Sequence, residues 1–256
     1  MRANRRLGSL AALAVGLALA AGAAEPRVLV YTRNHVTNGK GFVHDNIAVS
    51  VAALQEICKE AGIAVDVSDQ PSVFTADNLK KYKAVVFSNT NNEAFEDDAQ
   101  RETFKAYLRG GGAFVGIHSA TGSERKWPWY WGLIGGTFAW HHPMQEFTIQ
   151  IVDRKHPSTS HLPEGAWAWS DEFYTVRERD PNVRVLLAGE QKSLRKPGTP
   201  PPGLDLPDPY PLAWCHEFEG ARSFYTALGH KKEHYADPLF RRHLLGGIRW
   251  AIGAAE

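Results

Sequence analysis

The sequence predicts an α/β fold in which helices cover both faces of a mostly parallel sheet. In the first half, short apolar segments alternate with amphipathic ones, as in chains of β-α-β units. Residues 113–117 are apolar without polar alternation, which is typical of a strand buried on both faces. In the second half, two strand-like segments flank Glu219-Gly220, which indicates an antiparallel hairpin. Together these features favour a flavodoxin-like sheet with antiparallel additions in the C-terminal half.

The elements of the first half are expected in regular alternation. Asp45 is expected to cap a helix that ends before Gly62. Acidic residues in the first turn and a following glycine triplet, 110–112, define another helix over 97–109. A short helix is expected at 75–82, and strands are expected at 27–31, 63–67, 84–88 and 113–117. Right-handed crossovers would make these strands parallel.

The second half has a different pattern. Several tryptophans crowd residues 127–140, which we interpret as an insertion or a wall of the site. Residues 197–211 are rich in Pro and Gly and predict an extended surface loop. Asp237 and Pro238 predict the start of a last helix, which runs to about residue 252. Strands are expected at 146–152, 183–188, 212–218 and 222–228.

The N-terminus predicts export. Three arginines precede an apolar segment at about 10–21, and small residues follow it, which is typical of a secretory signal peptide over 1–24. That segment is short for a membrane span of about 20 residues, and no later segment is long and apolar enough, so no stable membrane insertion is expected. We therefore expect a single domain over 25–256 in a periplasmic or secreted protein.

Composition narrows the partners and cofactors. Lys plus Arg number 29 and Asp plus Glu number 28, so no basic excess supports nucleic-acid binding. Cys58 and Cys215 could form a disulfide in an oxidising compartment, but Cys58 shares an apolar helical face, which favours a small buried side chain. The glycine-rich run precedes a strand instead of following one, so no nucleotide cofactor is expected.

His118 stands at the end of the predicted buried strand, in the pattern Gly116-x-His118-x-Ala120. Small residues flank it as in a nucleophile elbow, where a sharp turn exposes one side chain, but the elbow carries His instead of Ser or Cys. The residue could be a metal ligand, a general acid or base, or a hydrogen-bonding anchor of the loop.

Other polar residues follow the predicted strands, and ligands of parallel sheets bind beyond the carboxyl ends of strands. His44 and His230 are candidates for the same centre as His118. Asp171 and Glu172 are neighbours on a strand, so they point to opposite faces and only one reaches the site. Glu172 with His118 and His230 would suit zinc or another divalent ion. Candidate substrate-binding residues are Arg33, Asn89, Asp171, Tyr174, His142 and Trp140.

The sequence resembles the ThuA-like (trehalose utilisation) family, whose fold is related to class I glutamine amidotransferases. The resemblance spans nearly the whole mature chain. It is carried by the segments 41–47, 112–120, 142–143 with 156–157, 171–174, and 229–230 with 250–253. It implies that His118 occupies the position of the amidotransferase cysteine, which argues against glutamine amidotransferase chemistry. It also implies a role with trehalose and related disaccharides through 3-keto sugar derivatives.

We therefore expect an exported enzyme that acts on a glycoside or keto-sugar, a small-molecule carbohydrate, as a lyase, isomerase or hydrolase. His118, His230, Glu172 and His44 are the expected catalytic residues, with a divalent metal such as zinc as a candidate cofactor. The alternative is a non-catalytic carbohydrate-binding or regulatory module with a degenerate amidotransferase fold. The tryptophan-rich segment could also form a homo-oligomer interface.

Overall fold

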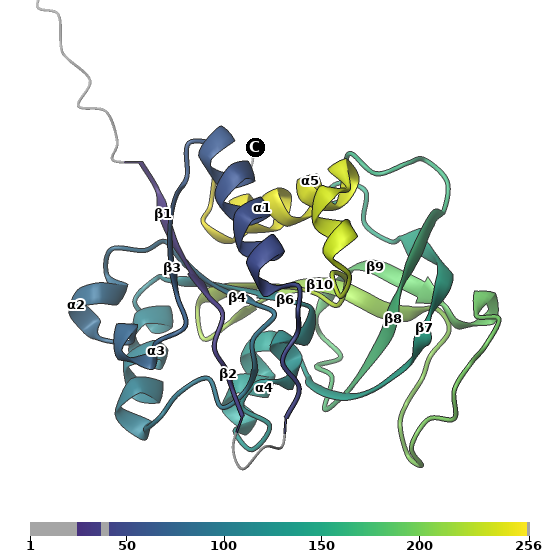
Figure 1. Cartoon of the computed structure of the whole chain (residues 1–256), viewed down its shortest axis with the longest axis horizontal. Helices are drawn as coiled ribbons and strands as arrows, with labels where there is room; N and C mark the ends of the chain where they lie inside the picture. Colours follow the sequence, from purple (N-terminus) through teal and green to yellow (C-terminus); the bar gives the residue numbers. More distant parts are fainter. Residues whose placement is uncertain (1–24, 37–40, 255–256) are drawn as a thin grey trace, which may run out of the picture.

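A nine-stranded sheet runs through the whole of the computed structural model, which describes residues 25–36 and 41–254 (Figure 1). Its strand order is β3-β1-β4-β6-β11-β10-β9-β7-β8. The first five strands of this order run parallel and the other four join by antiparallel pairing. The predicted α/β fold with a mostly parallel sheet and antiparallel additions is thereby confirmed.

The parallel strands follow the flavodoxin-type order, in which the first strand lies between the second and the third. Their bounds are β1 Arg27–Tyr31, β3 Ala64–Ser68, β4 Ala84–Ser88, β6 Ala113–Ile117 and β11 Ala221–Thr226. Every residue of β4 and β6 is buried, as the unbroken apolar pattern of 113–117 predicts. A separate two-stranded sheet pairs β2 Asn34–His35 with β5 Asn91–Asn92.

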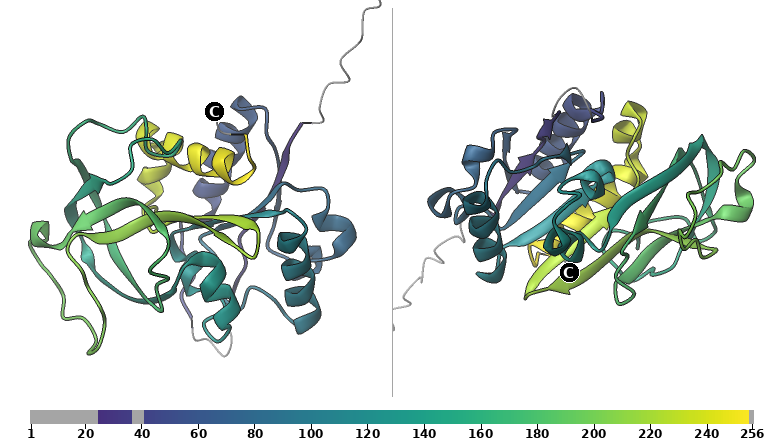
Figure 2. Two further views of the ribbon diagram at one scale, coloured as in Figure 1. Left: turned by 180° about the vertical axis from the view of Figure 1, so that it is seen from behind. Right: turned by 90° about the horizontal axis from the view of Figure 1, so that it is seen from below.

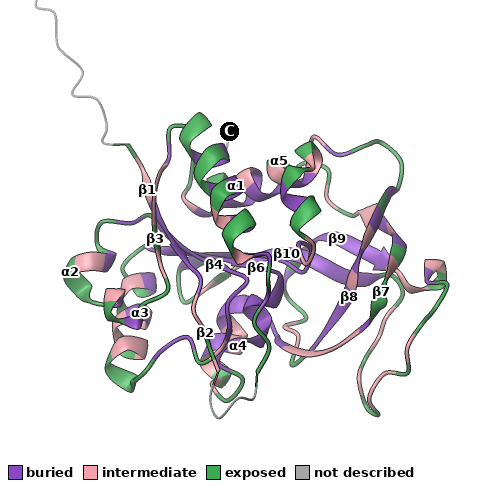
Figure 3. Ribbon diagram, in the orientation of Figure 1, coloured by how far each residue is buried: buried purple, intermediate pink, exposed green. Residues whose placement is uncertain are grey.

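Helices cover both faces of the parallel strands (Figures 1 and 2). On one face lie α1 Ile47–Glu60 and α5 Pro238–Ala251, which contact each other. On the other lie α2 Ala76–Leu79, α3 Asp98–Arg109 and α4 Pro128–Ile134. Short 3-10 turns occur at Pro71–Val73, His118–Gly122, Gln191–Ser193 and Lys232–Ala236. Burial is concentrated along the central strands, as Figure 3 shows.

The starts of α1 and α5 test the N-cap residues expected from the sequence. Asp237 accepts hydrogen bonds from the backbone N–H groups of Leu239 and Phe240, so this cap is confirmed. The predicted cap at Asp45 is wrong, because Asn46 takes the N-cap position of α1. Asp45 instead forms an ion pair with Lys232, at 2.7 Å between its carboxylate and the ammonium.

The antiparallel part is more extensive than predicted. The strands are β7 Thr137–Ile151, β8 Trp167–Arg177, β9 Arg184–Glu190 and β10 Tyr210–Phe218. The expected strand at 146–152 is only the second half of β7, and the tryptophan-rich segment divides between α4 and the start of β7. Register shifts interrupt β7, so the simple alternation that identifies a strand fails there.

Both cysteines are free and buried. No helix within residues 25–36 and 41–254 is long and apolar enough to cross a membrane. The signal peptide expected over 1–24 lies outside the described residues, and export stays a prediction.

Two buried histidines, His243 of α5 and His156, pack against Phe224 of β11. His243 contacts the carbonyl of Ser158 through Nδ1 at 2.9 Å, and His156 contacts the hydroxyl of Ser158 through Nδ1 at 2.8 Å. The Nε2 atoms of both rings are buried without a partner. Burial lowers the pKa of His243 to about 3 and that of His156 to about 4. Both rings are therefore neutral in the folded protein at neutral pH.

The low pKa values of these two histidines predict a loss of stability in mild acid. The unfolded chain protonates each imidazole near its ordinary pKa of about 6.5, whereas the folded protein does not, so acid favours unfolding. In His243→Asn, whose amide can still donate to Ser158, we expect the fall in unfolding free energy between pH 6.5 and 4.5 to be shallower by about 1.4 kcal/mol per pH unit. Denaturant unfolding across this range measures the slope. An unchanged slope would contradict the prediction, whatever the variant's absolute stability.

Candidate functional site

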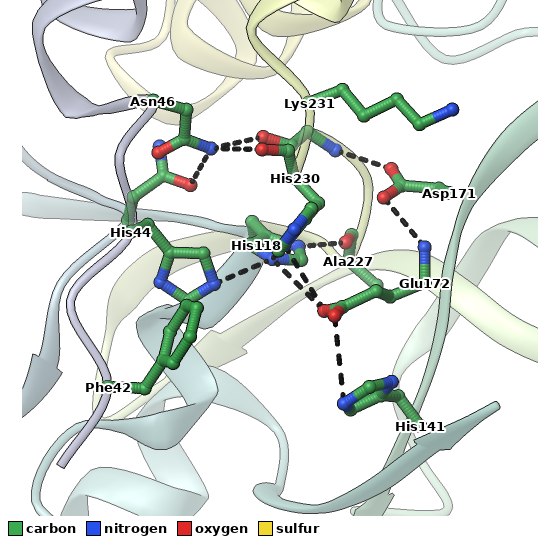
Figure 4. Close-up of polar contacts among 12 residues, drawn as sticks. Phe42, His44, Asn46, His118, His141, Asp171, Glu172, Ala227, His230 and Lys231 are labelled. Atoms are coloured by element: carbon green, nitrogen blue, oxygen red, sulfur yellow. Dashed lines mark hydrogen bonds and ion pairs between the residues drawn. The ribbon is translucent and has the colours of Figure 1, made fainter. Parts of the chain in front are cut away.

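Four side chains that are far apart in the sequence meet at the carboxyl ends of the parallel strands (Figure 4). His44 lies in the segment between β2 and α1, His118 directly follows β6, and His230 follows β11. Glu172 comes from β8 in the antiparallel part. One ligand atom from each of them lies within 4.8 Å of the others. The structure therefore brings together all four residues predicted to be catalytic.

His118 has the geometry of an elbow. Its backbone adopts a φ of +50°, in the left-handed region that a non-glycine residue seldom occupies, and the side chain is completely buried. The hydroxyl of Tyr225 donates a 2.8 Å hydrogen bond to the His118 carbonyl. Such strained backbone conformations concentrate at functional sites. The turn presents an imidazole inward, to the other residues of the centre.

The tautomer of His118 follows from its surroundings. Nδ1 lies 2.8 Å from the carbonyl oxygen of Ala227, so Nδ1 carries the proton and donates. In the neutral ring, Nε2 then holds a lone pair that faces the other histidines. Burial lowers the pKa of His118 well below its usual value, and the neighbouring His44 lowers it further. His118 is thus a neutral nitrogen donor at ordinary pH.

Three imidazole nitrogens converge at this point. Nε2 of His118 lies 3.1 Å from Nε2 of His44 and 3.2 Å from Nδ1 of His230. The lone pair on Nε2 of His118 faces both of these nitrogens. Burial, followed by repulsion from His230, lowers the pKa of His44 to about 4. His44 is therefore neutral at ordinary pH, like His118.

Glu172 supplies the negative charge of the centre. Its Oε2 lies 3.2 Å from Nδ1 of His230 and 3.8 Å from Nε2 of His118, and its Oε1 lies 3.6 Å from Nε2 of His141. Burial alone would raise the pKa of Glu172, but the hydrogen bond with His230 outweighs it and the pKa falls. Burial would lower the pKa of His230, yet the same bond raises it. The hydrogen bond thus shifts both pKa values in the direction that favours a charged pair.

These separations fit a divalent ion. Zinc binds nitrogen and oxygen at about 2.0–2.2 Å, so the donors of a tetrahedral site lie about 3.3 Å apart. Three contacts of 3.1–3.2 Å and one of 3.8 Å bracket that spacing. Imidazole and carboxylate donors are also the kinds that zinc and related metals prefer.

Two buried side chains hold the segment that carries His230. The amide of Asn46 donates to the carbonyls of Gly229 and His230, at 2.7 and 2.8 Å. From the other side, the carboxylate of Asp171 accepts the N–H of Gly229 at 2.9 Å and that of Glu172 at 2.8 Å. Burial raises the pKa of Asp171. Asp171 thereby positions both His230 and Glu172.

Of the predicted substrate-binding residues, Tyr174 lies at the centre, with its ring 4.3 Å from that of His118. Asn89 is buried and bonds Asn46 and Tyr235, and Asp171 is buried as described. These contacts are internal to the protein. A substrate-binding role for these three residues stays a prediction.

The remaining three candidates make other contacts. Arg33 donates to the carbonyl of Glu93 and pairs with Glu96. His142 accepts the N–H of Gly198 through Nδ1 and packs edge-on against Trp140, with ring centroids 4.5 Å apart. None of these contacts involves the four central residues, and a role in substrate binding stays a prediction here too.

Sequence reasoning missed His141, Phe42 and Phe138 as residues of the site. His141 pairs in register with Tyr174, so both side chains lie on the same face of the sheet. Phe138 packs against Tyr174 at 4.7 Å between centroids, and Phe42 against His44 at 4.7 Å. His141 can be placed beside Tyr174 only when β7 is known to begin at Thr137.

Comparisons with known proteins agree with this architecture. The family model described as trehalose utilisation, ThuA, matches residues 27–251. A ThuA-like protein from Bacteroides uniformis has a TM-score of 0.70 at 21% identity, covering 92% of this chain and 95% of that one. One from Parabacteroides merdae has 0.69 at 23%, covering 90% and 91%.

A similar fold occurs as part of a larger enzyme. A β-galactosidase from Rahnella sp. R3 has a TM-score of 0.54 at 15% identity, covering 91% of this chain and 32% of that one. A search among curated proteins gave no match. At these identities the solved structures establish the fold alone, whereas the family match spans nearly the whole described chain. The chain belongs to the ThuA family, which is described by trehalose utilisation.

Proposed function

We propose that this protein is an exported carbohydrate-processing enzyme that acts on a glycoside or keto-sugar at a divalent metal held by His44, His118, His230 and Glu172. The observation that carries the proposal is the convergence of three imidazole nitrogens and one carboxylate oxygen within 4.8 Å. The family description supports a carbohydrate as the substrate. Zinc suits this donor set.

Substrate would reach the centre from the side of Glu172 and His230. His118 is completely buried, whereas the side chains of Glu172 and His230 are 15% and 23% exposed. A catalytic zinc can accept a fifth ligand during reaction. A carbonyl oxygen of the sugar could therefore bind on this open side without displacing the buried histidines.

Exposed aromatic rings near the four central residues suit the binding of a sugar. Phe42 is 58% exposed although its ring contacts His44, and Phe138 is partly exposed beside Tyr174. An exposed phenyl ring is costly to hold in water, and its flat face complements the C–H face of a pyranose. The backbone of Phe42 is fixed by a 3.1 Å hydrogen bond from Asn91.

The chemistry follows from the metal and the nearby bases. A bound divalent ion supplies Lewis acidity, which polarises a sugar carbonyl and eases removal of a neighbouring proton. His141 is outside the four donors, has a 37% exposed side chain, and reaches Glu172 through Nε2 at 3.6 Å. We assign His141 as the acid–base group, with Tyr174 as a hydrogen-bond donor to the substrate. Isomerisation, elimination and hydration all use this set.

Metal binding is the first prediction. His118→Asn keeps a residue type that tolerates the left-handed backbone but removes the imidazole. We expect wild type to bind one zinc ion per chain and His118→Asn to bind it more than about 100-fold more weakly. This loss of affinity exceeds the loss that is typical when a residue hydrogen-bonded to a metal ligand is replaced. Calorimetric titration and elemental analysis measure both.

The control for this experiment is His161→Asn, because His161 is not among the four central residues and its Nε2 contacts the backbone carbonyl of Leu239. Its zinc affinity should equal that of wild type. Circular dichroism checks that each variant is folded. Wild-type protein that retains no zinc after dialysis, or a folded His118→Asn with unchanged affinity, would exclude the metal centre.

Turnover is the second prediction. The metal-loaded protein should convert one of a panel of disaccharides and their 3-keto forms to a new product, followed by NMR. His141→Gln should reduce the rate about 100-fold or more, as expected for loss of an acid–base group, with zinc affinity unchanged. His161→Gln should retain the wild-type rate.

The outcome decides between the enzyme and the non-catalytic alternative. Perturbed sugar resonances without a product, in protein that holds zinc, would contradict catalysis and favour a binding module. A product formed equally fast by His141→Gln would leave an enzyme but refute the role assigned to His141.

A further inference from the structure

Arg125 has no carboxylate partner. Its Nε donates to the carbonyl of Gly122 at 3.0 Å, and its Nη2 reaches the side-chain oxygen of Asn91 at 3.5 Å, which is a long contact. The preceding residue, Glu124, is turned away and pairs with Arg101 at 3.0 Å. Within residues 25–36 and 41–254, no acidic group forms an ion pair with Arg125.

A chain of ring contacts connects Arg125 to the metal-binding candidates. The guanidinium lies 5.1 Å from the centroid of Phe138, over its ring. Phe138 packs on Tyr174, and Tyr174 packs on His118, with centroid distances of 4.7 and 4.3 Å. The hydroxyl of Tyr174 has no hydrogen-bond partner in the described part of the chain and is not sealed from solvent. Arg125 and Tyr174 thus form one wall beside the centre.

Asn91 connects Arg125 to Phe42, the exposed aromatic residue beside His44. Its side-chain nitrogen donates to the carbonyl of Phe42, and its side-chain oxygen faces Nη2 of Arg125. Phe42 in turn contacts His44. The aromatic ring proposed to receive a sugar and the unpaired guanidinium are therefore fixed relative to each other, on either side of one buried amide.

The carboxylates around the centre already have partners. Glu172 pairs with His230 at 3.2 Å, Asp171 contacts His234 at 3.4 Å, and Asp45 pairs with Lys232 at 2.7 Å. Arg125 is exposed, and its guanidinium remains protonated at any physiological pH. A divalent ion at the centre would add further positive charge. An anionic group on the ligand would supply the missing counter-charge.

We propose that Arg125 is a specificity-determining residue that binds an anionic substituent, a carboxylate or a phosphate, on the sugar that the site accepts. The inference rests on the proposed function only in taking the site to be a carbohydrate site. The planar fork of Arg125 can hold either group through two parallel hydrogen bonds. The substrate class is then an acidic sugar, because a neutral disaccharide leaves the guanidinium unpaired.

Equilibrium binding tests this inference with sugars that differ in charge. The probes are methyl β-D-glucoside, methyl β-D-glucuronide and glucose 6-phosphate, titrated calorimetrically into the zinc-loaded protein at low and high salt. We expect at least one charged sugar to bind about tenfold or more tightly than the glucoside, with the preference reduced at high salt. The carboxylate and phosphate probes distinguish the two sources of charge.

The variants are Arg125→Gln, which removes the charge, and Arg125→Lys, which keeps it. The preference should disappear in Arg125→Gln and persist in part in Arg125→Lys. Lys126→Gln is the matched control, since it removes one positive charge from the neighbouring exposed residue and should leave the preference intact. Equal binding of charged and neutral sugars by wild type, no measurable binding of either charged sugar, or a preference that survives in Arg125→Gln would overturn the proposal.

This test is independent of turnover. A charge preference that Arg125→Gln abolishes supports the inference even when no product forms, and repeating the titration in metal-free protein separates the guanidinium from the ion. Conversely, equal binding of the sugars overturns the inference even when His118→Asn loses zinc.

Discussion

The candidate centre depends on the hydrogen bond from Nδ1 of His118 to the carbonyl of Ala227, 2.8 Å long. It joins the ends of β6 and β11, which pair in parallel up to Ile117 and Thr226. It also fixes the proton of His118 on the side away from the other donors, so that Nε2 presents a lone pair. Because His230 follows Ala227 by only three residues, the same bond sets the distance between the two histidines.

The second support is the buried carboxylate of Asp171. A buried charge is costly unless several donors surround it, and Asp171 accepts the N–H groups of Gly229, Glu172 and the Trp169 indole. An asparagine in this place would turn an amide N–H toward groups that only donate. An acceptor-only side chain is therefore required, and it is the reason that Glu172 and His230 face each other from different halves of the sheet.

The sequence was sufficient for the parallel sheet and for the four central residues. Uniform apolar strands and the rule that ligands lie beyond strand ends place His118, His44 and His230 at one edge. The rest depends on register. A register shift between His142 and Gln145 interrupts the alternation of β7, so the strand could not be recognised from the sequence. Without the register of β7, His141 could not be matched to Tyr174. Arg125 and Phe42 were hidden for another reason: each lies in irregular backbone, whose course is set by tertiary contacts such as those of Asn91.

Burial at the elbow decides which chemistry His118 can perform. A nucleophile at such a turn must be exposed to its substrate, whereas His118 has no exposed surface and its Nε2 faces two other imidazoles. A general base works best when its pKa lies near the ambient pH, and burial moves the pKa of His118 far below that. Yet the same burial favours a ligand role, because neutral His118 offers Nε2 without a proton and His44 is neutral as well. The elbow therefore favours holding an ion over attacking a substrate, and the proposed acid–base role goes to the more exposed His141.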